Sequence, residues 1–258
     1  MAEDFNMPRG ELMRGRRGFV LGVANHQSIA WGIASQLAAQ GAELAFGYME
    51  MNEKRVRPLG ESLGVKAYAT FDASQEGSIP AAFDEVGKAF GTLDFMVHAI
   101  GFAERSQIAG SFIANAERGA FLRAMDISVY SFVEASQCAA RLMGNGGSIV
   151  TMTYLGSERA IPNYNTMGVC KAALEAATRY IARDLGPRGI RVTLIQAGAI
   201  DTDMNPENGP AGDFLRSVTS LGHYGRAEDI AALVAYLASE GGRYVTGTAI
   251  TIDGGLAA

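Results

Sequence analysis

Cysteine, histidine and tryptophan are scarce in this chain of 258 residues, which has two, three and one of them respectively. So few histidines and cysteines, scattered along the sequence, form no cluster of metal ligands, and we expect no metal site. Cys138 and Cys170 both lie in apolar, helix-like patterns. We expect them to be buried free thiols in a reducing compartment, which favours a cytoplasmic protein.

Basic charge and long hydrophobic runs are also missing. The formal net charge of −5 argues against a nucleic acid as a partner. The arginines between residues 9 and 17 precede the apolar run GFVLGVA, which ends at Asn25 and is too short for a signal peptide or a membrane span. Apolar residues make up 48% of the chain and charged residues 19%, so we expect a soluble globular protein with a buried core.

The chain does have a regular alternation of strand-length and helix-length segments. Seven short apolar or β-branched runs are typical of strands: GFVLGVA, ELAFGY, KAYATF, DFMVHA, SIVTMT, RVTLIQ and AITI. Helix-length segments lie between them at residues 28–40, 78–90, 116–143, 163–185 and 227–238. The pattern predicts one α/β domain over residues 1–258. We expect a Rossmann fold, in which helices cover both faces of a doubly wound, seven-stranded parallel sheet.

The first predicted strand ends at Gly22, in a turn that leads through Ser28 into a helix. A glycine lets the backbone approach a phosphate closely, and a serine can cap the helix or bind the phosphate itself. The free N–H groups of the first helical turn form an anion site. The common G-x-G-x-x-G pattern is absent here, so an ordinary capped turn is the alternative. Its place after the first strand of a parallel sheet favours a dinucleotide site.

The end of the second strand bears on the choice between NAD and NADP. A 2′-phosphate is normally bound by an arginine or lysine at this point, whereas Met49 and Glu50 favour the uncharged ribose of NADH. Lys54, Arg55 and Arg57 follow closely, either as a source of charge for NADPH or as the exposed start of a helix. We therefore expect NADH, with NADPH the less favoured cofactor.

Further candidates follow the third and fourth strands. Asp72 is placed either to accept a hydrogen bond from the adenine amino group or to stabilise a turn. In HAIGFAE, Ile100 and Gly101 allow the backbone to pass close to the cofactor. Phe102 enters the site behind them and is a candidate for lining the substrate pocket.

Tyr164 and Lys171 stand seven residues apart in PNYNTMGVCKAALEAATRY, and Tyr154 lies ten residues upstream of the first. Seven residues are close to two helical turns, so Tyr164 and Lys171 are predicted to project from nearly the same face of a helix. An ammonium near a phenol stabilises the phenol's anion, which predicts a better proton donor at neutral pH. The same spacing also occurs by chance on solvent-exposed helix faces. The other motifs of the chain are what favour a catalytic role for Tyr164 and Lys171.

Several long motifs resemble a known family. GVANHQSIAWGIA, LDFMVHAIGFA, DISVYSF and TYLGSERAIPNYNTMGVCKAALEAATRYIARDLGPRGIRV are similar, from about residue 13 to residue 202, to the bacterial NADH-dependent enoyl-acyl-carrier-protein reductases. These form a divergent branch of the short-chain dehydrogenase/reductase superfamily. Ordinary members of the superfamily have a catalytic serine about thirteen residues before the tyrosine, where this chain has Thr151. The second tyrosine, Tyr154, is the mark of the enoyl reductase branch.

The resemblance implies a role for each matched residue. Tyr164 would hydrogen-bond the thioester carbonyl oxygen of the enoyl substrate, and Tyr154 would line the acyl pocket. Lys171 would hold the nicotinamide ribose and supply positive charge near the phenol. The residues implied to contact NADH are Gly22, Ser28, Ile29, Asp72, Ile100, Gly101, Lys171 and Thr202.

After Thr202 the resemblance changes character. TDMNP, GRAEDIA and VTGTAITIDGG look like segments of the ordinary carbonyl-reducing members of the superfamily, so the chain looks composite. We expect residues 203–223 to cover the substrate, with Met204 among the residues that line it, because this segment follows the carboxyl end of a strand. Residues 203–212 are rich in proline, glycine and asparagine and are expected to be a loop.

The leading hypothesis is an enzyme of fatty-acid synthesis that transfers hydride from NADH to the 2,3 double bond of an enoyl thioester, on acyl carrier protein or coenzyme A. The tail suggests an alternative, a dehydrogenase that reduces a ketone, with Thr151 or Thr153 replacing the missing serine. A third reading is a non-catalytic NAD(H)-binding sensor. In the superfamily, helices equivalent to 116–143 and 163–185 pair across two-fold interfaces, which predicts a homotetramer.

Overall fold

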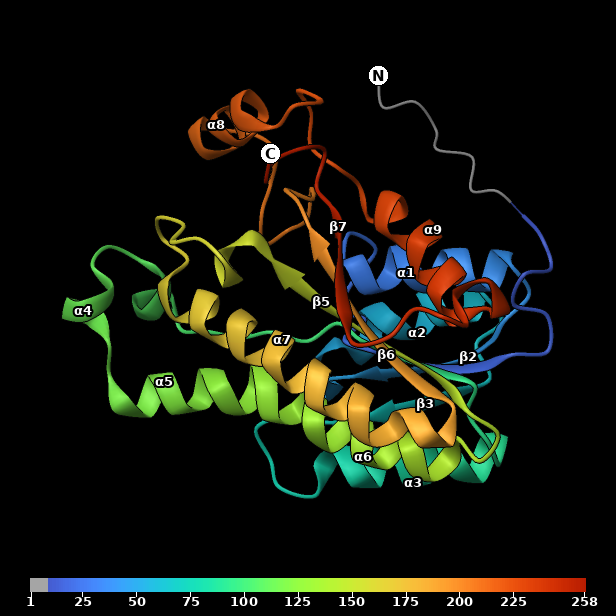
Figure 1. The fold of residues 1–258 in the computed structure, drawn as a ribbon. Coiled ribbons are helices and arrows are strands. Elements are labelled where there is room, and N and C mark those ends of the chain that lie inside the picture. Colours follow the sequence, from blue (N-terminus) through green and yellow to red (C-terminus); the bar gives the residue numbers. More distant parts are fainter. Residues whose placement is uncertain (1–8) are drawn as a thin grey trace.

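Seven strands form one parallel sheet in the computed structural model, which describes residues 9–258 (Figure 1). The strand order is β3-β2-β1-β4-β5-β6-β7. The strands are β1 (Arg17–Leu21), β2 (Glu43–Tyr48), β3 (Ala67–Thr70), β4 (Phe95–His98), β5 (Gly147–Tyr154), β6 (Ile190–Ala197) and β7 (Thr248–Ile252). Every predicted strand is present, and the doubly wound parallel sheet is confirmed.

Helices cover both faces of this sheet (Figure 1). The α-helices of residues 9–258 are α1 (Ile29–Ala39), α2 (Glu53–Ser62), α3 (Ser78–Phe90), α4 (Phe112–Asn115), α5 (Arg118–Met125), α6 (Ser131–Leu142), α7 (Asn165–Leu185), α8 (Pro210–Val218) and α9 (Ala227–Ala238), of which α4 and α8 project away from the sheet. The pair α1 and α9 packs on one face, and α3, α6 and α7 pack on the other. Within residues 9–258, no helix is long and apolar enough to cross a membrane.

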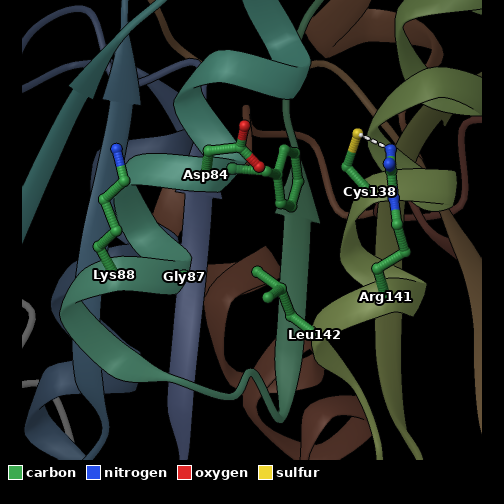
Figure 2. A pocket seen from close by; sticks show the side chains of 7 residues that line it. Asp84, Gly87, Lys88, Cys138, Arg141 and Leu142 are labelled. Atoms are coloured by element: carbon green, nitrogen blue, oxygen red, sulfur yellow. Dashed lines mark hydrogen bonds between the residues drawn. The ribbon is translucent and has the colours of Figure 1, made fainter.

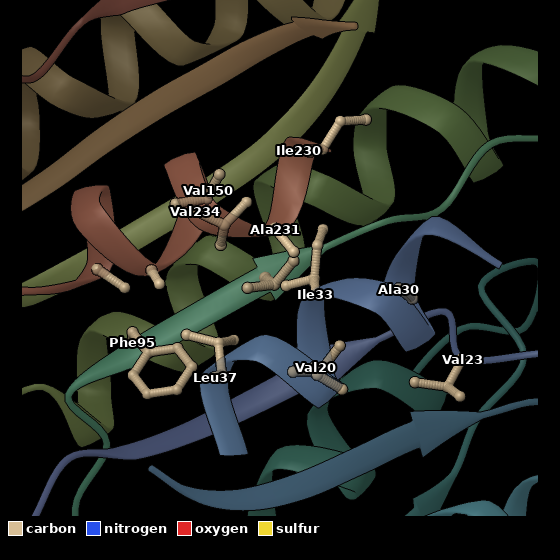
Figure 3. Close-up of a cluster of buried hydrophobic side chains, with 14 of the residues drawn as sticks. Val20, Val23, Ala30, Ile33, Leu37, Phe95, Val150, Ile230, Ala231 and Val234 are labelled. Carbon is tan, nitrogen blue, oxygen red and sulfur yellow. The ribbon is translucent and has the colours of Figure 1, made fainter. Parts of the chain in front are cut away.

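Two apolar layers hold the helices against the sheet. Figure 3 shows the layer under α1 and α9, in which Val20, Ile33 and Val234 are fully buried. On the other face of β1, Phe19 and Leu21 belong to the layer under α3 and α6. Successive residues of a strand point to opposite faces, so a strand covered on both sides is apolar at every position. This is why the strands appear in the sequence as unbroken apolar runs.

Some helices differ from the sequence-based expectation. The segment 116–143 is not one regular helix, because a turn of π-helix (η3, Asp126–Tyr130) separates α5 from α6. Such turns are common near functional sites. The expected loop at 203–212 ends early, because α8 begins at Pro210 after Gly209, whose φ is 102°. A glycine with positive φ followed by proline at the first helical position is a favourable helix start.

The strand order reverses between β1 and β4. From β1 the chain moves outward to β3, and from β4 it moves the other way to β7. In open parallel sheets, ligands bind in the crevice at the carboxyl ends of the strands where this reversal occurs. Gly22 follows β1 and Ile100 to Phe102 follow β4, so the fold places predicted cofactor residues on both sides of the crevice.

Candidate active site

The crevice between β1 and β4 is lined by bare backbone at Gly22. This residue has a φ of 98°, and a Cβ built on it would lie 2.2 Å from the carbonyl oxygen of Ala99. Its N–H donates to the carbonyl of Gly47 at 2.9 Å. Both the conformation and the close approach require glycine. The glycine is therefore required for the close approach of this turn to Ala99 after β4, and its contact with a phosphate stays a prediction.

Ser28 begins α1 beside this turn. Its Oγ accepts a hydrogen bond from the N–H of Trp31 at 3.2 Å and donates to the carbonyl of Asn25 at 2.8 Å. Of the two roles proposed for this serine, the helix cap is therefore present. Ile29 is partly buried against the core under α1, so it fixes the start of the helix. The first-turn N–H groups of α1 consequently lie at the mouth of the crevice.

The end of β2 combines the apolar side chain of Met49 with one nearby basic side chain, Arg57. Met49 is 43% exposed at the position where a cation would be expected. The side chain of Arg57 bonds Glu53 at 3.2 Å, and its guanidinium lies 4.6 Å from the ring centroid of Tyr68. The basic segment is helical, as one interpretation predicted, but Arg57 also contacts Tyr48 at the end of β2, so its charge lies near the predicted ribose site.

Asp72 acts as a turn residue in this structure. Its carboxylate accepts from the N–H of Ser74 at 2.9 Å and from the hydroxyl of the same residue at 2.6 Å. A third bond comes from Gln75 at 3.3 Å. The Ser74 bonds lower the pKa of Asp72, so the carboxylate is ionised at neutral pH. Its contact with adenine stays a prediction.

The loop after β4 brings Gly101 next to Lys171. A Cβ built on Gly101 would lie 3.9 Å from Nζ of Lys171 and 3.6 Å from Cε of Met167. Ser128, in the π-helical turn, fixes the next residue by accepting from the N–H of Phe102 at 2.9 Å and donating to its carbonyl at 3.0 Å. The side chain of Phe102 is 42% exposed. Ile100 packs partly buried under α3 and α6.

Tyr154 and Tyr164 meet at the carboxyl end of β5. Their ring centroids are 4.9 Å apart and the rings are tilted by 60°. Tyr154 is the last residue of β5, and Tyr164 is the residue that precedes α7. Asn163 and Asn165 on either side of it have positive φ values of 60° and 37°. Asparagine tolerates this conformation better than most residues, which accounts for the NYN sequence at the start of the helix.

The predicted effect of Lys171 on Tyr164 is wrong for this structure. Burial raises the pKa of the Tyr164 phenol, and the nearby Tyr154 raises it further. Lys171 is not among the groups that shift this pKa, and its ammonium is directed to the carbonyl of Met152 at 2.8 Å. Tyr164 also lies before the first residue of α7, so the two side chains do not simply share one helical face.

Lys171 is a buried cation, with 8% of its surface exposed. Burial lowers its pKa to about 8, while Cys170 and Glu175 oppose the shift. The ammonium form therefore predominates at neutral pH. One of its three N–H donors is used by Met152, which leaves donors for a ligand beside Gly101.

A buried histidine behind the crevice was not singled out from the sequence. His98 is fully buried at the end of β4, with its ring nitrogens 3.1 Å from Oγ1 of Thr151 and 2.9 Å from Oγ of Ser131. Burial lowers the pKa of His98 to about 3, with a further contribution from Lys171. The imidazole is therefore neutral. A single histidine in an apolar strand gave no signal of this contact, because Ser131 lies 33 residues away.

Residues 202–204 lie at the carboxyl end of the sheet but make few contacts with it. Oγ1 of Thr202 accepts from the N–H of Asn205 at 3.2 Å. Asp203 accepts from Asn25, in the turn after β1, at 2.6 Å. Met204 is 91% exposed. The substrate contact of Met204 and the cofactor contact of Thr202 stay predictions.

A cavity of about 350 Å³ borders Tyr164 on the side of α7, where Gly168 and Val169 contribute to its wall. Another cavity, of about 420 Å³, lies between α3 and α6 (Figure 2). There the thiol of Cys138 contacts the guanidinium of Arg141 at 3.0 Å. This second cavity lies along the later turns of both helices and contains none of the predicted site residues. Only the first cavity belongs to the candidate site.

Comparisons with known proteins agree with this geometry. The family described as enoyl-(acyl carrier protein) reductase matches residues 22–257. The enoyl-[acyl-carrier-protein] reductase [NADH] 2 of Rhizobium meliloti (strain 1021) is 46% identical over 248 residues, which is 95% of this chain and 92% of that protein.

Solved structures of two relatives are also similar. The enoyl-(acyl-carrier-protein) reductase from Anaplasma phagocytophilum in complex with NAD is 41% identical, with a TM-score of 0.89 over 98% of this chain and 95% of that one. The Bacillus cereus enoyl-acyl carrier protein reductase with NADP+ and indole naphthyridinone is 38% identical. Its TM-score is 0.90, over 95% of this chain and 97% of that one.

The match extends past Thr202 to residue 257 and so includes the tail that looks like carbonyl-reducing members. The sequence resemblance, the parallel sheet with its reversal between β1 and β4, and the paired tyrosines all lead to the same assignment. The chain belongs to the enoyl-acyl-carrier-protein reductase family of the short-chain dehydrogenase/reductase superfamily.

Proposed function

We propose that this protein reduces the 2,3 double bond of enoyl thioesters with hydride from NADH, in fatty-acid synthesis. The observation that carries the proposal is the pair of rings, Tyr154 and Tyr164, which meet at 4.9 Å beside the carboxyl end of β5. The buried ammonium of Lys171 faces Gly101 at the neighbouring strand end. Relatives named as NADH-dependent enoyl reductases support the same reaction.

Tyr164 is suited to stabilise the charge that develops during the reaction. When bound, NADH would supply a hydride to the β-carbon of the conjugated thioester, and a proton added at the α-carbon would complete the reduction. The Tyr164 hydroxyl donates to the thioester carbonyl oxygen, where negative charge builds up. Because burial raises its pKa, the phenol stays protonated and able to donate. One fixed donor to such an oxygen typically lowers the barrier by about 3 to 4 kcal/mol.

The residues of the crevice fit NADH. Gly22 presents bare backbone beside the first turn of α1, which suits a pyrophosphate. The free donors of Lys171 suit the hydroxyls of the nicotinamide ribose. At the end of β2, Met49 stands where a cation would bind a 2′-phosphate, and the ion pair with Glu53 partly neutralises Arg57, which favours NADH over NADPH. These residues bind and orient the cofactor, and Tyr154 lines the acyl pocket.

The ketone-reducing alternative needs a hydroxyl in place of the missing serine, and neither candidate threonine is free. Thr151 is 1% exposed and its Oγ1 donates to the carbonyl of His98 at 3.0 Å. Thr153 is 3% exposed and donates to Glu175 at 2.7 Å. A hydroxyl that is buried and already bonded cannot assist a substrate carbonyl. This arrangement favours reduction of the carbon–carbon double bond.

A spectrophotometric assay tests the proposal. Purified protein is mixed with crotonyl-coenzyme A and NADH, and loss of the reduced cofactor is followed by its absorbance. We expect turnover with crotonyl-coenzyme A, little with acetoacetyl-coenzyme A, and slower turnover when NADPH replaces NADH. Oxidation of NADH only with the ketone would refute the proposal. Tight binding of NADH without turnover of either substrate would instead support a sensor.

The finer partners are also proposals. The acyl group is carried by acyl carrier protein or coenzyme A, and the assay run with each carrier distinguishes them. Exposed apolar side chains on α5, η3 and α7 support a homotetramer: Leu122, Tyr130, Val169 and Tyr180. Light scattering that shows a stable monomer at micromolar concentration would contradict it. The two free, buried cysteines support a cytoplasmic location, which cell fractionation tests.

A further inference from the structure

The buried ammonium of Lys171 has weak local compensation. Its only hydrogen bond within residues 9–258 runs to the carbonyl of Met152 at 2.8 Å. Burying a charge is costly unless an opposite charge accompanies it. Yet the ion pairs of the described residues, all with nitrogen–oxygen distances within 4.0 Å, do not include Lys171. Any negative charge that stabilises the Lys171 ammonium therefore lies more than 4.0 Å from it.

Most titratable groups around Lys171 are neutral at pH 7. From β4, His98 has its pKa lowered by burial to about 3. From α7, burial raises the pKa of the Cys170 thiol to about 11. Burial also raises the pKa values of the two tyrosines of the site. Cys170 and then Glu175 raise the pKa of Lys171 against the larger effect of burial, and because the Cys170 thiol is neutral at pH 7, Glu175 is the group that supplies negative charge there.

Glu175 lies one helical turn after Lys171, so the two residues share a face of α7. Its Oε1 accepts from Oγ1 of Thr153 at 2.7 Å, and Thr153 is 3% exposed. Thr153 directly follows Met152, whose carbonyl accepts from the ammonium of Lys171. Two consecutive residues of β5 therefore hold the cation and the carboxylate at fixed positions.

We propose that Glu175 is a positioning residue for the reduction, because its carboxylate, held by Thr153, keeps the ammonium of Lys171 charged and directed at the cofactor. The inference rests on the proposed function, in which Lys171 holds the nicotinamide ribose. Glu175 touches neither substrate nor cofactor in this arrangement. It acts only through Lys171.

The small number of lysines allows a direct test. The chain has four, and Lys54, Lys66 and Lys88 are all exposed. In full-length protein with 13C-labelled lysine, the signal of Lys171 is identified by its loss in Lys171→Arg and is titrated by NMR. We expect Glu175→Gln to lower the pKa of Lys171 by about one unit, because a nearby opposite charge is removed.

Further variants distinguish the effect of the Glu175 charge on Lys171 from a structural effect of the substitution. Thr153→Val releases the carboxylate and is expected to lower the pKa of Lys171 by a smaller amount, whereas Thr153→Ser keeps the hydroxyl and restores the wild-type value. Glu158→Gln is the matched control, because Glu158 accepts from Gln196 at 3.3 Å and is not among the groups that shift Lys171. It should leave the titration unchanged.

The outcome can be judged separately from the proposed function. An unchanged Lys171 titration in Glu175→Gln, even with a lowered melting temperature, would overturn the proposal and leave Glu175 a purely structural residue. A wild-type protein that fails to reduce crotonyl-coenzyme A refutes the function, while the titration still reports on Glu175. In an active enzyme, the alkaline limb of kcat/KM for NADH should move to lower pH by the same amount in Glu175→Gln.

Discussion

The wall formed by β5 and α7 differs sharply from residues 203–223, here called the covering segment, in how its side chains are held. In the wall, Lys171 is 8% exposed and bonds Met152, and the rings of Tyr154 and Tyr164 pack together. In the covering segment, Met204 is 91% exposed and Phe214 is 63% exposed. The groups suited to the reaction are thus fixed by the core, whereas the apolar groups suited to an acyl chain are not.

This difference in burial explains why the wall and the covering segment have different roles in the proposed function. Burial shifts the pKa values of the wall, since it raises that of the Tyr164 phenol and lowers that of Lys171 to about 8. The apolar side chains of the covering segment, such as Met204 and Phe214, are exposed and are not fixed by the core. The wall therefore specifies a reaction, and the covering segment is the place where substrate choice can vary.

The strongest challenge to this comparison is Tyr164→Phe, which removes only the hydroxyl. We expect kcat for crotonyl-coenzyme A to fall about 100- to 1,000-fold, because one oxyanion donor is lost. NADH affinity, measured by fluorescence titration, should change little. Tyr244→Phe, at a tyrosine that is 99% exposed and lies outside the predicted site, is the control and should behave as wild type. Equal losses of turnover and NADH affinity in Tyr164→Phe would show that the phenol is structural.

The next effect is expected from Gly22→Ala. A side chain there meets the carbonyl of Ala99 at 2.2 Å and also requires a φ of 98°. Strain of this kind costs about 1 to 3 kcal/mol, so we expect at least tenfold weaker NADH binding and a lower melting temperature. Gly64→Ala is the control, because Gly64 has a φ of 69° but no atom near its Cβ position. Similar NADH affinity in the two variants would mean that the close approach at Gly22 is unimportant.

The pH dependence of the wall follows from Lys171. Its pKa is lowered to about 8, so the ammonium is lost as the pH rises through that value. We expect kcat/KM for NADH, which reports the free enzyme, to fall up to about tenfold per pH unit above 8. The free energy of unfolding should rise between pH 8 and 10.5, because the lysine binds more protons in the unfolded state than in the folded state over this range. A profile that stays level to pH 10 would exclude a role for the charged lysine.

The smallest effect is expected in the covering segment. Met204→Ala removes a side chain that is 91% exposed, so the free energy of unfolding should change by less than about 0.5 kcal/mol. We expect kcat/KM for crotonyl-coenzyme A to stay within about threefold of wild type, since a single exposed contact contributes little. If the loss instead grows with acyl chain length, the segment folds over longer substrates, and the contrast with the wall holds only for the free protein.

The sequence predicted the regular parts of the fold well and the contacts between them poorly. The seven strands follow from local apolar runs, and the positions of Tyr164 and Lys171 follow from one motif. The helix that begins at Pro210 was missed, because loop-forming residues precede it directly. The bond between His98 and Ser131 was missed because these residues come from separate elements that only the folded sheet brings together.

The amino-acid sequence by itself determined the order of strands and helices, the glycine needed at position 22 and the chemical groups available for catalysis. Those properties depend on local periodicity and residue type, which can be read along the chain. Only the tertiary structure decided the pKa shifts of Tyr164 and Lys171 and the bonding of Thr153. These depend on loss of water and on partners distant in sequence, so the ammonium lies by Met152 and burial raises the pKa of the phenol.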